Sequence, residues 1–214
     1  MGGGVKTTGT GAPAAAVRNW RSHDDLDLPP ILEAALADFQ QHGYHGSTVR
    51  GISSRVGVTM PSLYYHYGNK EGILFALLDV AMEDLLAHIK RGMDDAGDDV
   101  TAKFQNFITA VALHNTRRHD LATLHDEFRF LGTDSRATYV GKRSIVEQTL
   151  EELLREGSAG GVFDDSDPHF TARLLLGMLN GIIDWYHAPG PLTATEIADR
   201  YTQAALRLVC RLNP

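Results

Sequence analysis

Apolar side chains at helical spacing run through almost the whole chain after Pro29-Pro30, and no other feature constrains the fold as strongly. Over residues 73–89 they recur three or four positions apart, the spacing that forms one face of a helix. No segment alternates apolar and polar residues over the length of a strand. The sequence therefore predicts an all-α protein.

Capping residues, glycines and prolines divide this pattern into helices. A first helix is expected after Pro30 with an end near Gly43, a second begins at Ser47 or Thr48, and a third follows Thr59. A long fourth helix is expected after Asn69, with its end in a loop around residues 92–99. Four or five more helices are expected, at about 99–116, 119–131, 135–157, 167–187 and 193–212.

Composition sets the N-terminal segment apart. Residues 1–28 are rich in glycine and alanine and have few large apolar side chains, so we expect a flexible arm. The arm is either inert or able to enter a DNA minor groove through Arg18 and Arg21. We expect a helix-turn-helix domain over residues 29–75 and a second domain over residues 76–214.

The distribution of charge agrees with this division. The net charge is −7 overall, but it is +1 over residues 1–70 and −8 over residues 71–214. Because contact with phosphate is electrostatic, a polyanion is expected to meet the first third of the chain and to be repelled by the rest.

The segment from Ser47 to Glu71 is the most informative, because two short helices are joined there by Val56-Gly57-Val58. Glycine allows the positive φ angle that such a tight turn needs. This arrangement predicts a helix-turn-helix, whose second helix enters the major groove of DNA. That helix concentrates hydroxyl and imidazole groups, which can reach phosphates and base edges, although Tyr64 and Tyr65 are also compatible with packing alone.

This segment resembles the TetR family of bacterial transcriptional regulators. It contains G-Y-x-G-S-T from Gly43, I-x-x-x-V-G-V from Ile52 and P-S-L-Y-Y-H-Y-x-N-K-E from Pro61, at the family's spacing. Ser53 departs from the pattern, which usually has alanine there. The resemblance implies a three-helix DNA-binding domain, a helical ligand-binding and dimerisation domain, a homodimer, and release of a palindromic operator when a small molecule binds.

The resemblance also places candidate DNA contacts on the two short helices and just after them. Arg50 stands where members often read a base or reach a phosphate, and Met60 and Ser62 stand where side chains face bases, although Met60 offers no hydrogen-bond donor. Tyr64, His66 and Lys70 match phosphate contacts. The expected DNA-binding residues are Thr48, Arg50, Thr59, Met60, Ser62, Tyr64, Tyr65, His66 and Lys70.

A further resemblance concerns the small molecule. Residues 185–193 contain W-Y-x-x-x-G-P-L-T, similar to a junction in a TetR subgroup that includes regulators of fatty-acid and steroid breakdown, which sense acyl-coenzyme A thioesters. A Trp-Tyr pair there can equally be a core plug. We expect an apolar effector such as an acyl-CoA in a cavity within residues 99–187. The expected ligand-binding residues are Phe104, Phe107, Val111, Arg117, Leu124, Phe128 and Trp185.

The two last helices are expected to form a dimer interface. Their apolar faces, over about residues 167–212, are wider than the ~100° stripe that one core needs. Leu179 and Leu208 are expected to lie in this interface, and an ordinary monomer core is the alternative. Arg117 and its neighbour Arg118 are expected either to hold a carboxylate or coenzyme A phosphate or to belong to a solvated face.

Neither a metal nor a cofactor is expected. His114, His119, His125 and Asp126 lie near one another in the sequence, but His114 and His119 diverge by about 140° on a helix, and two arginines between them repel a cation. The single cysteine, Cys210, excludes an intramolecular disulfide and a multi-cysteine zinc site.

Several other classes of protein are excluded by the motifs that the chain lacks. It contains no Ser-His-Asp set, phosphate-binding glycine loop or H-E-x-x-H motif, so we do not expect an enzyme. No apolar run approaches the ~20 residues of a membrane-spanning helix and no secretory signal begins the chain, so a cytoplasmic protein is expected. Two alternatives stay open, a multidrug or efflux-type TetR repressor and a TetR-like regulator controlled by a protein partner.

Overall fold

The computed structural model describes residues 19–23 and 26–210, and over these residues it contains helices and no strand, which confirms the all-α prediction. Residues 1–18, with most of the predicted arm and Arg18, lie outside the described residues. The elements are α1 (Pro30–Gly46), α2 (Val49–Val56), α3 (Met60–Tyr67), α4 (Lys70–Asp95), α5 (Val100–Arg117), α6 (His119–Ala122), η1 (Thr123–Phe130), α7 (Thr133–Ala159), α8 (Pro168–Asn180), α9 (Ile182–Trp185) and α10 (Ala194–Val209).

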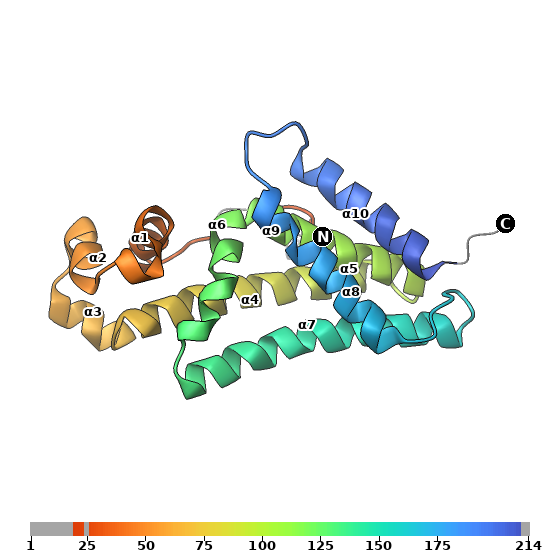
Figure 1. Cartoon of the computed structure of the whole chain (residues 1–214), viewed down its shortest axis with the longest axis horizontal. Coiled ribbons are helices and arrows are strands. Elements are labelled where there is room, and N and C mark those ends of the chain that lie inside the picture. Colours follow the sequence, from red (N-terminus) through yellow and green to blue (C-terminus); the bar gives the residue numbers. More distant parts are fainter. Residues whose placement is uncertain (1–18, 24–25, 211–214) are drawn as a thin grey trace, which may run out of the picture.

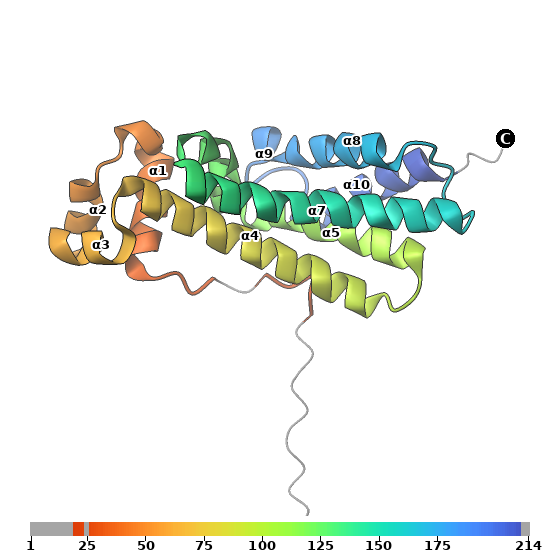
Figure 2. The same ribbon diagram turned by 90° about the horizontal axis from the view of Figure 1, so that it is seen from below.

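Helices α1–α3 form a small group at one end of an elongated molecule, and the later helices form its body (Figure 1). Helix α4 starts beside α3 and runs far along the body, next to α5 and α7 (Figure 2). Helix α8 packs on α7, and α10 packs on α5. Because α4 starts beside α3 and continues along the body, it connects the small group to the body without a linker.

Among the described helices, none is both long and apolar enough to cross a lipid bilayer.

The starts of α2, α3 and α4 agree with the prediction, because capping depends on nearby residues only. The side chains of Thr48, Thr59 and Asn69 each accept a hydrogen bond from the backbone N–H three residues later, at 3.0, 3.4 and 2.8 Å. Each such cap stabilises its helix by ~1 kcal/mol.

Several predicted helix limits differ from the structure. Gly92, expected in a loop, lies inside α4, where its lack of a side chain leaves room for Trp20: a Cβ there would lie 3.3 Å from two of its ring carbons. The expected helix over 119–131 is a short α-helix followed by the 3-10 helix η1. The expected helix over 167–187 is divided at Gly181 into α8 and α9.

Residues 19–23 pack on the body, so the expectation of a flexible arm is wrong for this part of the chain. Trp20 is 4% exposed, and its Nε1 donates a hydrogen bond to Asp95 Oδ2 at 3.0 Å. Arg21 lies over the Trp20 ring and donates to Asn106 Oδ1 at 3.2 Å. These contacts hold Arg21 near the end of α4 that is far from α3, which contradicts its predicted minor-groove role (Figure 2).

The predicted apolar face of the long fourth helix forms the centre of the core. Its eight members are all buried, which confirms them: Ile73, Leu74, Leu77, Leu78, Ala81, Met82, Leu85 and Ile89. Phe104 and Phe107 of α5 are fully buried in the same core. Side chains packed this closely transmit displacements, so α4 and α5 are expected to move together.

Helix α8 presents apolar residues on two sides. Leu175 and Leu179 are fully buried in the subunit, whereas Phe170 and Leu174 are 64% and 49% exposed. On α10, Leu208 is 52% exposed. Leu179 therefore cannot take part directly in a dimer interface, and Phe170, Leu174 and Leu208 are the apolar residues of these helices that remain open to a partner.

Candidate functional site

The two short helices α2 and α3 meet at a tight turn. Gly57 has a φ of 73°, in the left-handed region, and the backbone N–H groups of Gly57 and Val58 both donate to the Ser53 carbonyl, at 3.0 and 3.2 Å. Ile52 of α2 and Leu63 of α3 are fully buried beneath the turn. Because Leu63 fixes which side of α3 faces the core, the opposite side of α3 faces solvent.

The solvent-facing surface of the α2–α3 pair, with its two N-cap residues, holds most of the predicted DNA-binding residues. Tyr65 is 87% exposed and Tyr64 47%, so packing within the subunit does not account for Tyr65. The other predicted residues with open or half-open side chains are Thr48, Arg50, Thr59, Ser62 and His66. Hydroxyl, imidazole and guanidinium groups presented together on a helix pair can contact phosphates and base edges.

Met60 is an exception among them. Its side chain is half-buried, and the Ser53 hydroxyl lies 3.2 Å from Met60 Sδ and 3.1 Å from the Arg50 carbonyl oxygen. Ser53, the departure from the family's usual alanine, thus ties α2 to the start of α3. The Met60 sulfur faces α2, which argues against the predicted base contact.

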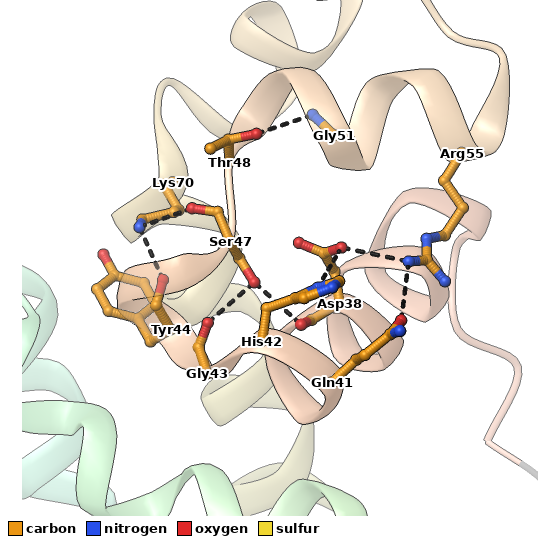
Figure 3. A network of polar contacts seen from close by, with 10 residues as sticks. All are labelled: Asp38, Gln41, His42, Gly43, Tyr44, Ser47, Thr48, Gly51, Arg55 and Lys70. Carbon is orange, nitrogen blue, oxygen red and sulfur yellow. Dashed lines mark hydrogen bonds and ion pairs between the residues drawn. The ribbon is translucent and has the colours of Figure 1, made fainter.

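Lys70 also differs from its predicted role at a phosphate. Its Nζ donates to the backbone carbonyls of Tyr44 and Ser47, at 2.7 and 3.0 Å, and lies 4.4 Å from the centre of the Tyr44 ring. Two of the three ammonium protons are therefore used inside the protein. Lys70, the first residue of α4, holds the connection between α1 and α2 (Figure 3).

A second set of contacts fixes α2 against α1 (Figure 3). Asp38 is buried and accepts from Arg55 at 3.3 Å, and His42 lies 3.2 Å from the same carboxylate oxygen. The Ser47 hydroxyl lies 3.0 Å from the Asp38 carbonyl and 2.9 Å from that of Gly43, where φ is 70° and the helix kinks. Sequence reasoning missed Asp38 and Arg55, since their pairing depends on how two helices pack.

The charge of this end of the molecule suits a polyanion. From Phe39 to Lys70 the chain contains three arginines and lysines, three histidines and no aspartate or glutamate. This stretch is therefore positive although the whole chain has a net charge of −7, and it contains α2 and α3 with their exposed side chains.

The body contains a cavity of about 670 Å³ between α4, α5, η1, α7 and α8. Its wall combines apolar side chains, such as Leu85 and Phe128, with polar ones, such as Asn115 and Arg143. Pockets of this size, apolar with a few polar groups, are typical of small-molecule sites.

One polar pair in the wall can donate a hydrogen bond to a ligand. Burial lowers the pKa of His125 to about 3 and raises the pKa of Tyr139 to about 12, so both groups are neutral. The Tyr139 hydroxyl and His125 Nδ1 lie 2.5 Å apart, and which of them donates depends on the tautomer of the ring. In the tautomer that accepts from the hydroxyl, the ring proton is on Nε2, which can donate to a carbonyl or carboxylate of a ligand.

The structure places only part of the predicted ligand-binding set at this cavity. Val111 and Phe128 line the cavity, but Phe104, Phe107 and Leu124 do not, because they are buried in the core. Arg117 lines a different cavity, of about 740 Å³, between α1 and the end of α5. Trp185 lines neither; it is 46% exposed, and its Nε1 donates to the Tyr201 hydroxyl at 3.3 Å.

The cavity residues that sequence reasoning missed are mainly polar ones, among them Asn115, Tyr139, Arg143 and Arg173. Tyr139 and Arg143 stand four positions apart on α7 and so share a face, which was a usable signal. Arg118, expected beside Arg117 as an anion receptor, instead donates from Nε to Asp84 Oδ2 at 3.1 Å.

Comparisons with known proteins agree with this geometry. The family model "Bacterial regulatory proteins, tetR family" matches residues 31–77, and the model "Tetracyclin repressor-like, C-terminal domain" matches residues 97–209. The first match contains the exposed helices α2 and α3. The second contains most of the cavity wall.

Similar proteins include two named repressors. The chain is 25% identical over 178 residues to the HTH-type transcriptional repressor KstR2 of Mycobacterium tuberculosis, covering 82% of this chain and 89% of that protein. The structure of KstR2, titled a ketosteroid transcriptional regulator, has a TM-score of 0.75 at 24% identity, covering 85% of this chain and 93% of that one. The repressor AcnR of Corynebacterium glutamicum is 35% identical over 165 residues, covering 72% of this chain and 78% of that protein.

A third similar protein was solved together with a small molecule and DNA. The crystal structure of AibR in complex with isovaleryl coenzyme A and operator DNA has a TM-score of 0.70 with this chain, at 26% identity. The similarity covers 81% of this chain and 95% of that one.

Proposed function

The chain belongs to the TetR family of bacterial regulatory proteins, and we propose that it is a repressor that leaves its operator when an acyl-coenzyme A or a related thioester fills the cavity in the body. Members of this family regulate transcription by binding DNA. The family and the named relatives are regulators rather than enzymes.

The observation that carries this proposal is the course of α4. Met82 and Leu85 of this helix line the cavity, and Lys70 at its first position holds the α1–α2 connection. A ligand that displaces α4 at the cavity therefore moves the residues that orient α2 and α3. Such a ligand acts as an inducer only if it binds the conformation with α4 displaced more tightly than the conformation that binds DNA.

We assign the DNA contacts to the exposed residues of the helix pair. These residues are Thr48, Arg50, Thr59, Ser62, Tyr64, Tyr65 and His66. A helix-turn-helix reads one half-site, so a twofold dimer is needed to read a palindrome with half-sites about 34–36 Å apart or a multiple of that distance. The exposed apolar residues of α8 and α10 are available for such a dimer.

An acyl thioester suits the cavity for two reasons. The apolar part of the wall gains ~25 cal/mol for each Å² of acyl chain that it buries. Arg143 lines the cavity and forms no ion pair with any described residue, so it can meet a phosphate of coenzyme A. KstR2, named for ketosteroids, and AibR, solved with isovaleryl coenzyme A, support this class of effector.

The test is a panel of ligands measured by melting temperature and by release of fluorescent DNA taken from upstream of the protein's own gene. Long-chain acyl-CoA and steroid-derived thioesters should raise the melting temperature and release the DNA, and the free acids should do so less well. Arg143→Gln should weaken the thioester response. Arg136→Gln is the matched control, because Arg136 and Arg143 both lie over the Phe128 ring but only Arg143 lines the cavity.

A second candidate is a repressor that responds to cationic drugs, because Asp126 and Asp184 also line the cavity. If the thioesters leave both readouts flat and a planar cation shifts them, this efflux-type function replaces the metabolic one. If no small molecule acts, control by a protein partner is favoured.

A further inference from the structure

A cluster of ionisable side chains lies apart from the helix pair and the effector cavity, where residues 19–23, α4 and α5 meet. A ring nitrogen of His23, a ring nitrogen of His88 and a carboxylate oxygen of Asp84 all lie within 4.8 Å of one another. From α5, His114 Nδ1 lies 3.7 Å from Asp84 Oδ2. Three imidazoles and one carboxylate thus converge from three separate parts of the chain.

Two of the imidazoles have unused nitrogen atoms. His114 is fully buried, and no described residue offers a hydrogen-bond partner to either of its ring nitrogens; its 3.7 Å approach to Asp84 is too long for such a bond. Both ring nitrogens of His23 are also buried and lack a partner within the described part of the chain. Buried polar atoms are rarely left unpaired in folded proteins, and a bound metal ion would give these nitrogens a partner.

We propose that His23, Asp84, His88 and His114 form a binding site for a divalent transition metal, with Zn²⁺ as the best match. Zn²⁺ takes four ligands from imidazole, thiolate and carboxylate groups. Mg²⁺ and Ca²⁺ need oxygen ligands, of which the cluster has too few. Tetrahedral ligand atoms around Zn²⁺ lie about 3.3 Å apart, so the ligand atoms of His23, Asp84 and His88, which now lie within 4.8 Å of one another, have to move closer together.

His23 is the side chain that has to turn. Its ring stacks on that of His88, with centroids 4.1 Å apart and planes at 14°, and parallel rings cannot both direct a nitrogen at one ion. Because the His23 nitrogens bond no other described residue, this rotation breaks no described hydrogen bond. His88 has to give up one contact to bind the ion, because its Nδ1 lies 2.8 Å from the Asp84 carbonyl oxygen and its Nε2 lies 3.3 Å from that of Ser22.

Two arginines border the cluster and limit which metals it can hold. Arg118 Nε lies 3.1 Å from Asp84 Oδ2, and Arg91 Nη2 lies 3.2 Å from His88 Nδ1. Their charge weakens the binding of any cation, so only a metal with strong affinity for neutral imidazole is retained. Arg118 also orients the carboxylate, as the outer partners of metal ligands do.

The experiment uses the full chain without a histidine tag, first stripped of metal with a chelator. Zn²⁺ at about 100-fold above its Kd should raise the melting temperature by about 5–10 °C. His23→Phe should abolish this rise, since phenylalanine keeps a flat ring on His88 but offers no ligand. His169→Ala is the control, because His169 is an exposed histidine of α8 and should leave the rise intact.

Co²⁺ gives a second readout that reports coordination directly. The wild-type protein should give the intense visible absorption of a four-coordinate Co²⁺ site, and His23→Phe should lose it even if the variant's melting temperature also changes. Equal Zn²⁺ stabilisation of the wild type and His23→Phe would overturn the proposal. So would the absence of both a melting shift and a Co²⁺ spectrum in the wild-type protein.

Discussion

At the scale of single residues, the position of Lys70 decides how the helix pair is held. A lysine just after a recognition helix suggests a phosphate contact, and the sequence alone supports that role. The structure brings Lys70 to two backbone carbonyls that lie 23 and 26 residues earlier in the chain. Nothing near Lys70 in the sequence indicates these partners, since they depend on the kink at Gly43 and on the packing of α1 against α4.

Replacement of Lys70 by alanine should therefore lower stability as well as DNA binding. Loss of charge-assisted bonds to two carbonyls is expected to cost about 1–3 kcal/mol of unfolding free energy, measured by urea denaturation. Arg50→Ala should change the unfolding free energy by less than about 0.5 kcal/mol, because Arg50 is exposed, while it lowers operator affinity. If Lys70→Ala keeps full stability and only lowers the salt dependence of DNA binding, Lys70 is a phosphate contact as the sequence suggested.

At the scale of helices and turns, the sequence predicts what depends on nearby residues and misses what depends on distant ones. The caps at Thr48, Thr59 and Asn69 were predictable because each bonds a backbone group three residues away. The cavity was not, because its wall is assembled from helices far apart in the chain. The sequence predicts that Phe104 and Arg117 line the cavity, yet packing places the first in the core and the second in another cavity.

Two glycines test how far stability depends on the local backbone conformation. A Cβ at Gly57 or at Gly141 would meet no atom within 4 Å, so the two positions differ in backbone conformation and not in the space around them. Gly57→Ala should destabilise the protein by about 1–2 kcal/mol, because its φ of 73° is unfavourable for alanine. Gly141→Ala, in the helical interior of α7, should stabilise it by about 0.5–1 kcal/mol. Equal effects in chemical denaturation would show that the turn relaxes.

At the scale of the whole molecule, the dimer and the α4 connection determine whether a ligand can control DNA binding. Leu174 of α8 and Ile145 of α7 are both 49% exposed and so form a matched pair. Leu174→Glu should give a monomer with weak operator binding, whereas Ile145→Glu should remain a dimer. Sedimentation and DNA titration measure the two properties. A dimer of unchanged operator affinity in Leu174→Glu would place the interface elsewhere.

The most direct test of ligand control is the thioester affinity of the dimer with and without bound DNA from upstream of its own gene, measured by calorimetry. If the two sites are coupled through α4, DNA must weaken thioester binding by the same factor by which the thioester weakens DNA binding. We expect this equality for the wild-type protein and a typical factor of about 5–150. Equal thioester affinity in the presence and absence of DNA would contradict control of the operator by the cavity.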